Sequence, residues 1–431
     1  YKQNLNDEQF EIWAGTDNLT GTTGEKTQAQ AKTFEGFSAP DTSAMEALQQ
    51  NIKGDGSTEI IVNYTRNKYK VETDAPEGSH IKETGGDKPD AKFEETVILT
   101  VEPEEGYHVE KWIDEDGKEY TVDPKDPKLE VETPSKDKKY TPVAVANTDT
   151  PYTVEHWLQN VADDDYTYAI SDNPQPRGTT GQLTSAKALT GNAAYKGFEA
   201  KSITQENIKG DGSTTVKVYY DRVKNDVEVA NPAGSHVKKV SDPQTGKKFE
   251  EPIIVTAEPE DGYYIEYWED DKGNKVKVGT EIDPVPEYPF DMPDTDVKLT
   301  PVAKPKTDTP YKVKHYQELL QGESQFETNP SWTADRTGTT DTLTDAKAKT
   351  DFIGFTAITT GDKAWKNANI SGKGDTVVDI YYARNKHNVN LYKDDKTTTS
   401  VTGGGKDIKF GTEITVKAEA QPGYHFSKWV D

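Results

Sequence analysis

The residues that could most readily do chemistry lie in an eight-residue stretch, NIKGDGST, which occurs at 51–58 and again, letter for letter, at 207–214. A Gly-Asp-Gly run beside Lys and Ser or Thr could cradle a phosphate or hold a cation. A phosphate loop places its Lys after the glycines and opens a helix, whereas here the Lys precedes them and a strand-like segment follows. A calcium loop needs several oxygen ligands at alternate positions, and GDGS offers one carboxylate. Neither chemistry therefore fits well.

A divergent third copy, NISGKGDT at 369–376, shows which feature the three stretches share. Aligned on the Tyr-Tyr pair that follows, it keeps both glycines but has Lys373 where the other copies have Asp55 and Asp211. Glycine is the residue that a turn with a positive φ needs. We therefore predict a structural turn rather than a ligand site at each glycine pair: Gly54 and Gly56, Gly210 and Gly212, Gly372 and Gly374.

The other candidate metal and catalytic residues lack the spacing that either chemistry needs. Acidic runs at 114–117 and 270–273 have no distal Glu to complete a calcium loop, so we interpret them as hairpin turns, with a weak surface calcium site as the alternative. The seven histidines are scattered and form neither His-x-His nor HExxH. No Gly-x-Ser-x-Gly elbow or distinctive carboxylate pair occurs. We predict no catalytic residue, no metal site, no cofactor and no enzymatic activity.

Composition excludes further classes of function. The 431 residues carry 51 Lys and Arg against 76 Asp and Glu, a net charge of −25, which disfavours binding to nucleic acid or to an anionic membrane. No run approaches the roughly 18 apolar residues that would span a bilayer, so we expect no membrane insertion. The absence of cysteine excludes disulfides and thiolate chemistry. A hydrophobic fraction of 32% suits several small modules with thin cores better than one large globule.

Internal repetition organises the whole chain. An A repeat is marked by GTTGE, GTTGQ and GTTDT, by FEGF, YKGF and FIGF, and by the closing strings NYTRN, YYDRV and YYARN. A B repeat is marked by GYHVEKW, GYYIEYW and GYHFSKW, each after an alternating apolar run. The modules alternate, and we predict A repeats at 1–66, 148–222 and 307–385 and B repeats at 67–147, 223–306 and 386–431. We expect the first A repeat to lack its first strand and the last B repeat to be truncated.

Most of the predicted elements are strands. Alternating apolar and polar residues predict strands at 152–157 and 214–222. Gly, Pro and Asp turns separate the alternating runs of the B repeats, which predicts a meander of strands. One short helix is predicted at 42–52, with Thr42 or Ser43 as its N-cap. The predicted fold class is mainly β, in an elongated tandem array of small modules.

The aromatic residues fall into two groups. The Tyr and Trp of the B signature recur in every copy, which predicts a place in the core or in contacts between modules: Tyr107, Trp112, Tyr263, Trp268, Tyr424 and Trp429. Three further tryptophans do not recur in this way: Trp157, Trp332 and Trp365. We interpret these as packing residues, with stacking surfaces for a sugar ring as the alternative.

These motifs carry two family resemblances. The A repeat, with its Tyr-x-Val-x-His-Trp, Gly-Thr-Thr-Gly and GDGSTTVKVYYDR strings, resembles the MucBP-like (mucin-binding-protein-like) repeats of bacterial surface proteins, which are small β-grasp modules. The B repeat, with Gly-Tyr and a following Trp after an alternating strand, resembles divergent internalin-type B repeats. The resemblance implies an extracellular protein of a Gram-positive bacterium, attached to the cell wall or secreted. No ligand-binding residue follows from it.

We therefore predict a non-enzymatic stalk or spacer of a surface adhesin, monomeric and extended. One alternative is that the A repeats bind host glycans, glycoproteins or other surface proteins. Another is a non-catalytic arm of a larger surface enzyme. A Lys–Asn or Lys–Asp isopeptide bond would suit a stalk without cysteine, but the sequence does not select a pair.

Overall fold

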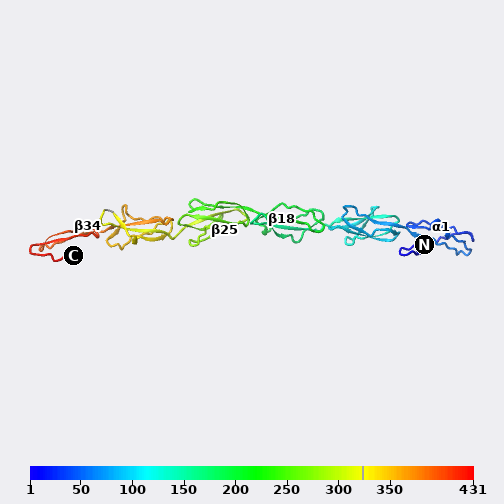
Figure 1. Ribbon diagram of the computed structural model, residues 1–431, viewed down its shortest axis with the longest axis horizontal. Helices are drawn as coiled ribbons and strands as arrows, with labels where there is room; N and C mark the ends of the chain where they lie inside the picture. The colour runs from blue at the N-terminus through cyan, green and yellow to red at the C-terminus, as the bar shows by residue number, and fades with distance from the viewer. Residues whose placement is uncertain (323–324) are drawn as a thin grey trace. The chain divides into compact units, whose positions relative to one another are not determined.

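The computed structural model describes residues 1–322 and 325–431 and is almost entirely β, as predicted (Figure 1). It contains two compact units, Tyr1–Asp221 and Arg222–Asp431. Many small sheets follow one another along the chain. Among the described residues α1 (Thr42–Leu48) is the only α-helix. The mainly-β class with small tandem modules is therefore confirmed.

The second and third A repeats each contain a mixed sheet with a parallel central pair, of four strands in the second and five in the third. In the second, the order is β15-β14-β18-β17, and in the third it is β28-β27-β31-β30. The strands are β14 (Thr153–Gln159), β15 (Tyr166–Ser171), β17 (Phe198–Ala200), β18 (Thr215–Arg222), β27 (Thr309–Glu318), β28 (Phe326–Thr328), β30 (Phe355–Ala357) and β31 (Thr376–Arg384). Parallel neighbours need a long connection. The Gly-Thr-Thr turn and the paired glycines both lie in that connection.

Short elements complete these two repeats. In the second, β13 (Thr150–Pro151) pairs with β16 (Arg177–Gly178), and in the third β29 (Ala334–Gly338) pairs with β27. Each has one 3-10 turn, η1 (Ala193–Tyr195) or η2 (Pro330–Trp332). A buried histidine, His156 or His315, lies on the inward face of each sheet, with its Nδ1 2.8 Å from the hydroxyl of Tyr220 or Tyr382.

The first A repeat has only short strands, β1 (Lys2–Gln3), β2 (Phe10–Glu11), β3 (Phe37–Ser38) and β4 (Thr65–Arg66). The predicted helix at 42–52 is present but shorter, and its predicted cap is wrong. Asp41 is the N-cap, and its carboxylate accepts a hydrogen bond from the Ala44 amide at 2.8 Å. A carboxylate both satisfies a free amide and interacts favourably with the positive end of the helix.

The B repeats are not simple meanders, which corrects the prediction. The first has one sheet in the order β10-β9-β12-β5-β7 and a second in the order β11-β8-β6. The second B repeat has the same pattern, β24-β23-β26-β19-β21 beside β20-β22-β25. In each five-stranded sheet the first strand of the repeat pairs in parallel with its last strand. This long-range pairing closes each B repeat on itself.

The strands of the two complete B repeats match one for one. The first contains β5 (Lys68–Thr73), β6 (Ile81–Gly85), β7 (Lys88–Lys92), β8 (Thr96–Pro103), β9 (Tyr107–Asp114), β10 (Glu119–Thr121), β11 (Leu129–Glu132) and β12 (Lys138–Ala146). The second contains β19 (Lys224–Val229), β20 (Val237–Val240), β21 (Gln244–Lys248), β22 (Pro252–Pro259), β23 (Tyr263–Asp270), β24 (Lys275–Val278), β25 (Glu287–Asp291) and β26 (Val297–Pro305). In the last B repeat the strands are β32 (Lys386–Val389), β33 (Thr398–Thr402), β34 (Gly405–Lys409) and β35 (Lys417–Ala420).

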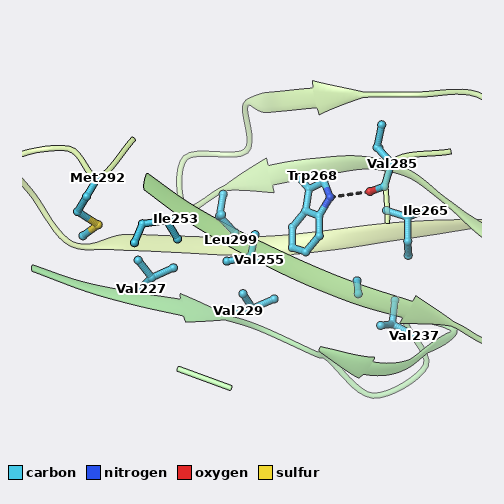
Figure 2. Close-up of a cluster of buried hydrophobic side chains, with 11 residues drawn as sticks. Val227, Val229, Val237, Ile253, Val255, Ile265, Trp268, Val285, Met292 and Leu299 are labelled. Atoms are coloured by element: carbon cyan, nitrogen blue, oxygen red, sulfur yellow. Dashed lines mark hydrogen bonds between the residues drawn. The ribbon is translucent and has the colours of Figure 1, made fainter. Parts of the chain in front are cut away.

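A buried tryptophan lies at the centre of each complete B repeat. Figure 2 shows Trp268 among aliphatic side chains, with its Nε1–H donating to the Val285 carbonyl at 2.8 Å. Trp112 has the same environment and donates to the Pro127 carbonyl at 2.8 Å. Both are 0% exposed, whereas Trp429 of the last B repeat is 40% exposed. A large ring whose one polar atom is satisfied suits a thin core.

Candidate functional site at the repeat junctions

The aspartates of the NIKGDGST stretches form hydrogen bonds within the turn that contains them. Asp55 accepts the Ser57 amide at 3.0 Å, and Asp211 accepts the Ser213 amide at 2.9 Å. These hydrogen bonds hold the pKa of each carboxyl below its ordinary value. Each stretch forms an Asx turn on the surface, in which the Asp carboxylate accepts a hydrogen bond from the backbone amide two residues later.

The two glycines of each pair have different roles, which refines the prediction of a turn. Only the second has a positive φ: 73° at Gly56, 73° at Gly212 and 71° at Gly374. The first glycine of the second and third A repeats lies against the preceding B repeat. A Cβ on Gly210 would lie 1.7 Å from the Glu105 carbonyl oxygen, a contact that sequence reasoning missed.

The third A repeat forms the same contact with the second B repeat. A Cβ on Gly372 would lie 1.8 Å from the carbonyl oxygen of Asp261. The partner glycines are equally crowded, because a Cβ on Gly106 or Gly262 would lie 2.3 Å from the Cα of the glycine opposite. Backbone therefore touches backbone at both junctions. The signal in the sequence was a glycine present in every copy at a position where the turn itself does not require one.

The linker between the repeats is hydrogen-bonded to both of them. Asn147 donates its amide to the Gly106 carbonyl at 2.8 Å, and its carbonyl accepts the Thr180 amide at 3.0 Å. At the second junction Lys306 occupies the place of Asn147. Its amide donates to the Gly262 carbonyl at 2.8 Å, and its carbonyl accepts the Thr340 amide at 3.0 Å. The Gly-Thr-Thr turn is thus part of the junction.

The tyrosine of the Gly-Tyr signature also lies at this junction. Tyr107 stacks on His80 and Tyr263 on His236, with ring centroids 3.9 and 4.1 Å apart. Tyr263 donates its hydroxyl hydrogen to Asp341 of the third A repeat. Burial and this hydrogen bond raise the pKa of Tyr263 to about 12. These tyrosines, assigned from the sequence to the core or to module contacts, lie at the contact.

The opposite junction, where an A repeat is followed by a B repeat, uses an arginine and a phenylalanine. Arg66, 7% exposed, donates to the Phe93 carbonyl and to the Glu94 carboxylate, both at 2.7 Å. The Phe93 ring covers Gly36, where a Cβ would lie 2.2 Å from a ring carbon. The aromatic-x-Gly-Phe motif therefore receives the next repeat, a role that sequence reasoning missed.

The third A repeat repeats this arrangement with the last B repeat. Arg384 donates to the Phe410 carbonyl at 2.9 Å, and the Phe410 ring covers Gly354 at the same 2.2 Å. Lys409 adds an ion pair of 2.8 Å to Glu318, which corresponds in position to Gln3 of the first A repeat.

The three tryptophans considered for sugar binding lie in different surroundings. Trp365 packs against the core of the third A repeat, and Trp332 packs on Phe352 with ring centroids 5.3 Å apart. Trp157 lies on the outward face of β14, beside Tyr168 at 5.7 Å and under the Lys217 ammonium at 4.6 Å. Trp157 belongs to the second A repeat, and Trp332 and Trp365 belong to the third.

The first B repeat contains a buried ion pair. Lys138 Nζ lies 2.6 Å from Asp114 Oδ2, which also accepts the Tyr120 hydroxyl at 3.0 Å. Burial opposes ionisation of Asp114, but the hydrogen bonds from Lys138, the Lys118 amide and Tyr120 outweigh it and lower its pKa to about 2. Because an ionised carboxylate is a poor acylating group, the site favours an ion pair over the isopeptide bond considered above.

Within residues 1–322 and 325–431, no three potential metal-ligand side chains gather. No helix in that part of the chain is long and apolar enough to cross a membrane.

The solved structures that are similar to this chain share little of its sequence. Among solved structures, the Bacillus anthracis TIE protein is similar at 8% identity and a TM-score of 0.21, over 67% of this chain and 71% of that one. The pilus adhesin SpaC from Lactobacillus rhamnosus GG is similar at 9% identity and a TM-score of 0.15, over 78% of this chain and 46% of that one. The search of curated proteins found no match.

The family comparison is more specific. Residues 69–148, 225–302 and 389–431 match the family model of the divergent InlB B-repeat domain. These segments lie in the three B repeats, whereas the resemblance of the A repeats to MucBP-like modules stays a prediction. The chain is thus a repeat region in which three segments match the divergent InlB B-repeat domain.

Proposed function

We propose that this chain is a non-enzymatic repeat region of a bacterial cell-surface protein and serves as a spacer that projects, or contributes to, an adhesive region. The internalin-type family of the B repeats supports an extracellular surface location. The observation that carries the spacer role is the fit at the junctions. Gly210 on Glu105 and Gly372 on Asp261 leave no room for a Cβ, so the repeats in contact are held in one arrangement.

The charge of the chain supports the same role. A net charge of −25 favours solubility and opposes non-specific association between near-identical repeats. Two junction types occur within the two units, and in both a glycine admits the backbone or the ring of the neighbouring repeat. A spacer needs such defined junctions more than it needs a pocket.

Small-angle X-ray scattering of the full chain tests this proposal. A compact protein of this length has a radius of gyration of roughly 22 Å. We expect a value at least twice as large, and a smaller, more variable one when Gly210 and Gly372 are both changed to Val. The matched control is Gly54→Val, which meets no neighbouring repeat. A wild-type value near that of a compact protein would overturn the spacer.

A second candidate function is glycan binding by the second A repeat. The outward face of its sheet carries an aromatic row in which Trp157 lies between Tyr168, 49% exposed, and Tyr219. Flat aromatic faces stack on sugar rings, and Lys217 and Glu155 beside the row offer polar groups for hydroxyls. On a glycan array, binding by the full chain that is lost in Trp157→Ala and kept in Trp332→Ala would support this function. No binding to any glycan would exclude it.

A further inference from the structure

The first A repeat presents, uncovered, the surface that the other two A repeats use at their junctions with B repeats. Gly54 corresponds to Gly210 and Gly372, but the nearest atom to its added Cβ is Cγ2 of its own Thr23, at 3.5 Å. Thr23 is exposed, whereas its counterparts Thr180 and Thr340 are buried. We call Thr23, Gly24, Gly54 and Gly56 the open face.

Gly54 has no local reason to be glycine. Gly21 of the same repeat has one, because its Cβ would lie 2.4 Å from Ile52 Cδ1, and Gly56 has one in its φ of 73°. Gly54 has neither a positive φ nor a crowded Cβ. The only cause seen for glycine at this position is the close approach of another backbone, as Glu105 approaches Gly210.

The remaining residues of the open face correspond to residues that contact the linker in the other two A repeats. Pro151 lies over Gly212 and Pro310 over Gly374, with Cγ 3.2 and 2.8 Å from the added Cβ, whereas nothing lies within 4 Å of Gly56. The amide of Thr23 corresponds to those that bond the Asn147 and Lys306 carbonyls. The open face therefore has a place for a Gly-Tyr turn and a place for the linker after it.

We propose that the open face is a docking site for the Gly-Tyr turn of a B repeat together with the Thr-Pro linker that follows it, the pair that covers the equivalent glycines of the other two A repeats. The turn supplies a carbonyl that seats on Gly54, and the linker supplies the carbonyl that accepts the Thr23 amide. A tethered partner is favoured because the contact is small and part of its hydrogen bonding comes from the linker itself. A tether provides an effective concentration in the millimolar range. The proposal stands whether or not the array acts as a spacer.

Amide hydrogen exchange on an extended chain tests the proposal. Residues 67–156 of this sequence are placed directly before Tyr1 of the full chain, which repeats the order seen before Trp157. We expect the Thr23 amide to exchange at least tenfold more slowly than in the unextended chain, because it acquires a hydrogen bond. Gly54→Ala should abolish this protection in the extended chain and leave exchange in the unextended chain unchanged.

A matched control separates docking from completion of the sheet. An extension by residues 148–156 alone restores the linker and strand without a B repeat. Equal protection of Thr23 by this short extension would overturn the proposal, as would protection that survives Gly54→Ala. Protection that appears in the unextended chain as its own concentration rises would assign the face to a second copy and would also overturn it. None of these outcomes depends on the scattering result that tests the spacer.

Discussion

The first and second B repeats share their strand order, the register of their parallel pair and a buried tryptophan, yet different residues begin that parallel pair on the last strand. Lys138 in β12 pairs with Val71, and the equivalent Val297 in β26 pairs with Val227. Lys138 reaches Asp114, whose side chain is 0% exposed. Val297 instead packs against the apolar core of its repeat.

The aspartate at the turn is present in both repeats and has different partners. Asp270, the counterpart of Asp114, accepts hydrogen bonds from the amide and side chain of Asn274 at 2.8 and 2.9 Å. One fold therefore accepts either an ion pair or an apolar contact at the same place. Breaking a buried pair is costly, whereas replacing both partners together can be close to neutral. The difference teaches that the pair is a local alternative and not a requirement of the B-repeat fold.

The largest expected effect is the loss of stability on removing the buried tryptophan that both repeats share. Trp112→Ala and Trp268→Ala should each cost about 3–5 kcal/mol of local stability, because each removes a large side chain that is 0% exposed. Hydrogen exchange of β9 and β23 measures this loss in the full chain. Trp429→Ala is the control, with an expected loss below about 1 kcal/mol, since Trp429 is 40% exposed. Equal effects at all three sites would show that the buried ring is not what stabilises the complete repeats.

The next largest effect is expected in the first B repeat alone, because only this repeat has the Lys138–Asp114 ion pair. Lys138→Val, which introduces the residue of the second repeat, should cost about 3 kcal/mol because it leaves the Asp114 carboxylate buried without its ion-pair partner. The double variant Lys138→Val with Asp114→Asn should recover most of that loss. Exchange in β9 and β12 reports both values. If the single variant were as stable as the wild type, the ion pair would have no measurable role.

How much of the fold and of the junctions could be predicted depends on how far apart in the sequence the interacting residues lie. The alternating strands and the buried Trp112 and Trp268 follow from local patterns in the sequence, whereas Trp429 and Tyr424, expected in the same core or contact positions, are 40% and 58% exposed. Lys138 has the charge of an ordinary surface residue, and nothing nearby in sequence marks Asp114 as its partner. The parallel pairing of β5 with β12 joins the two ends of a repeat, so local turns suggested a meander instead. Gly210 was recognised as necessary and assigned to the turn, because Glu105 is far away in the sequence.

Acidification should also reduce the stability of the two B repeats to different extents. The pKa of Asp114 is lowered from 3.8 to about 2, so its stabilising contribution is complete above pH 3.8 and is lost as the pH falls through about 2. The loss in the first B repeat amounts to about 2 kcal/mol. Asp270 also has a lowered pKa, but it is held by Asn274 and is less buried, so we expect a smaller loss. Exchange measured between pH 5 and pH 2 checks this, and Lys138→Val should flatten the response of the first repeat.

The smallest effect concerns the Gly-Tyr turns of the same two repeats. Tyr263 donates to the Asp341 carboxylate, whereas Tyr107 faces Gly181, which offers no side-chain acceptor. Tyr263→Phe should therefore cost about 1 kcal/mol at its junction, the usual net value of a hydrogen bond, and Tyr107→Phe clearly less. The exchange rates of the Thr340 and Thr180 amides report the two junctions separately. An equal loss at both would mean that stacking on His236 and His80, which both tyrosines share, matters more than the hydroxyl.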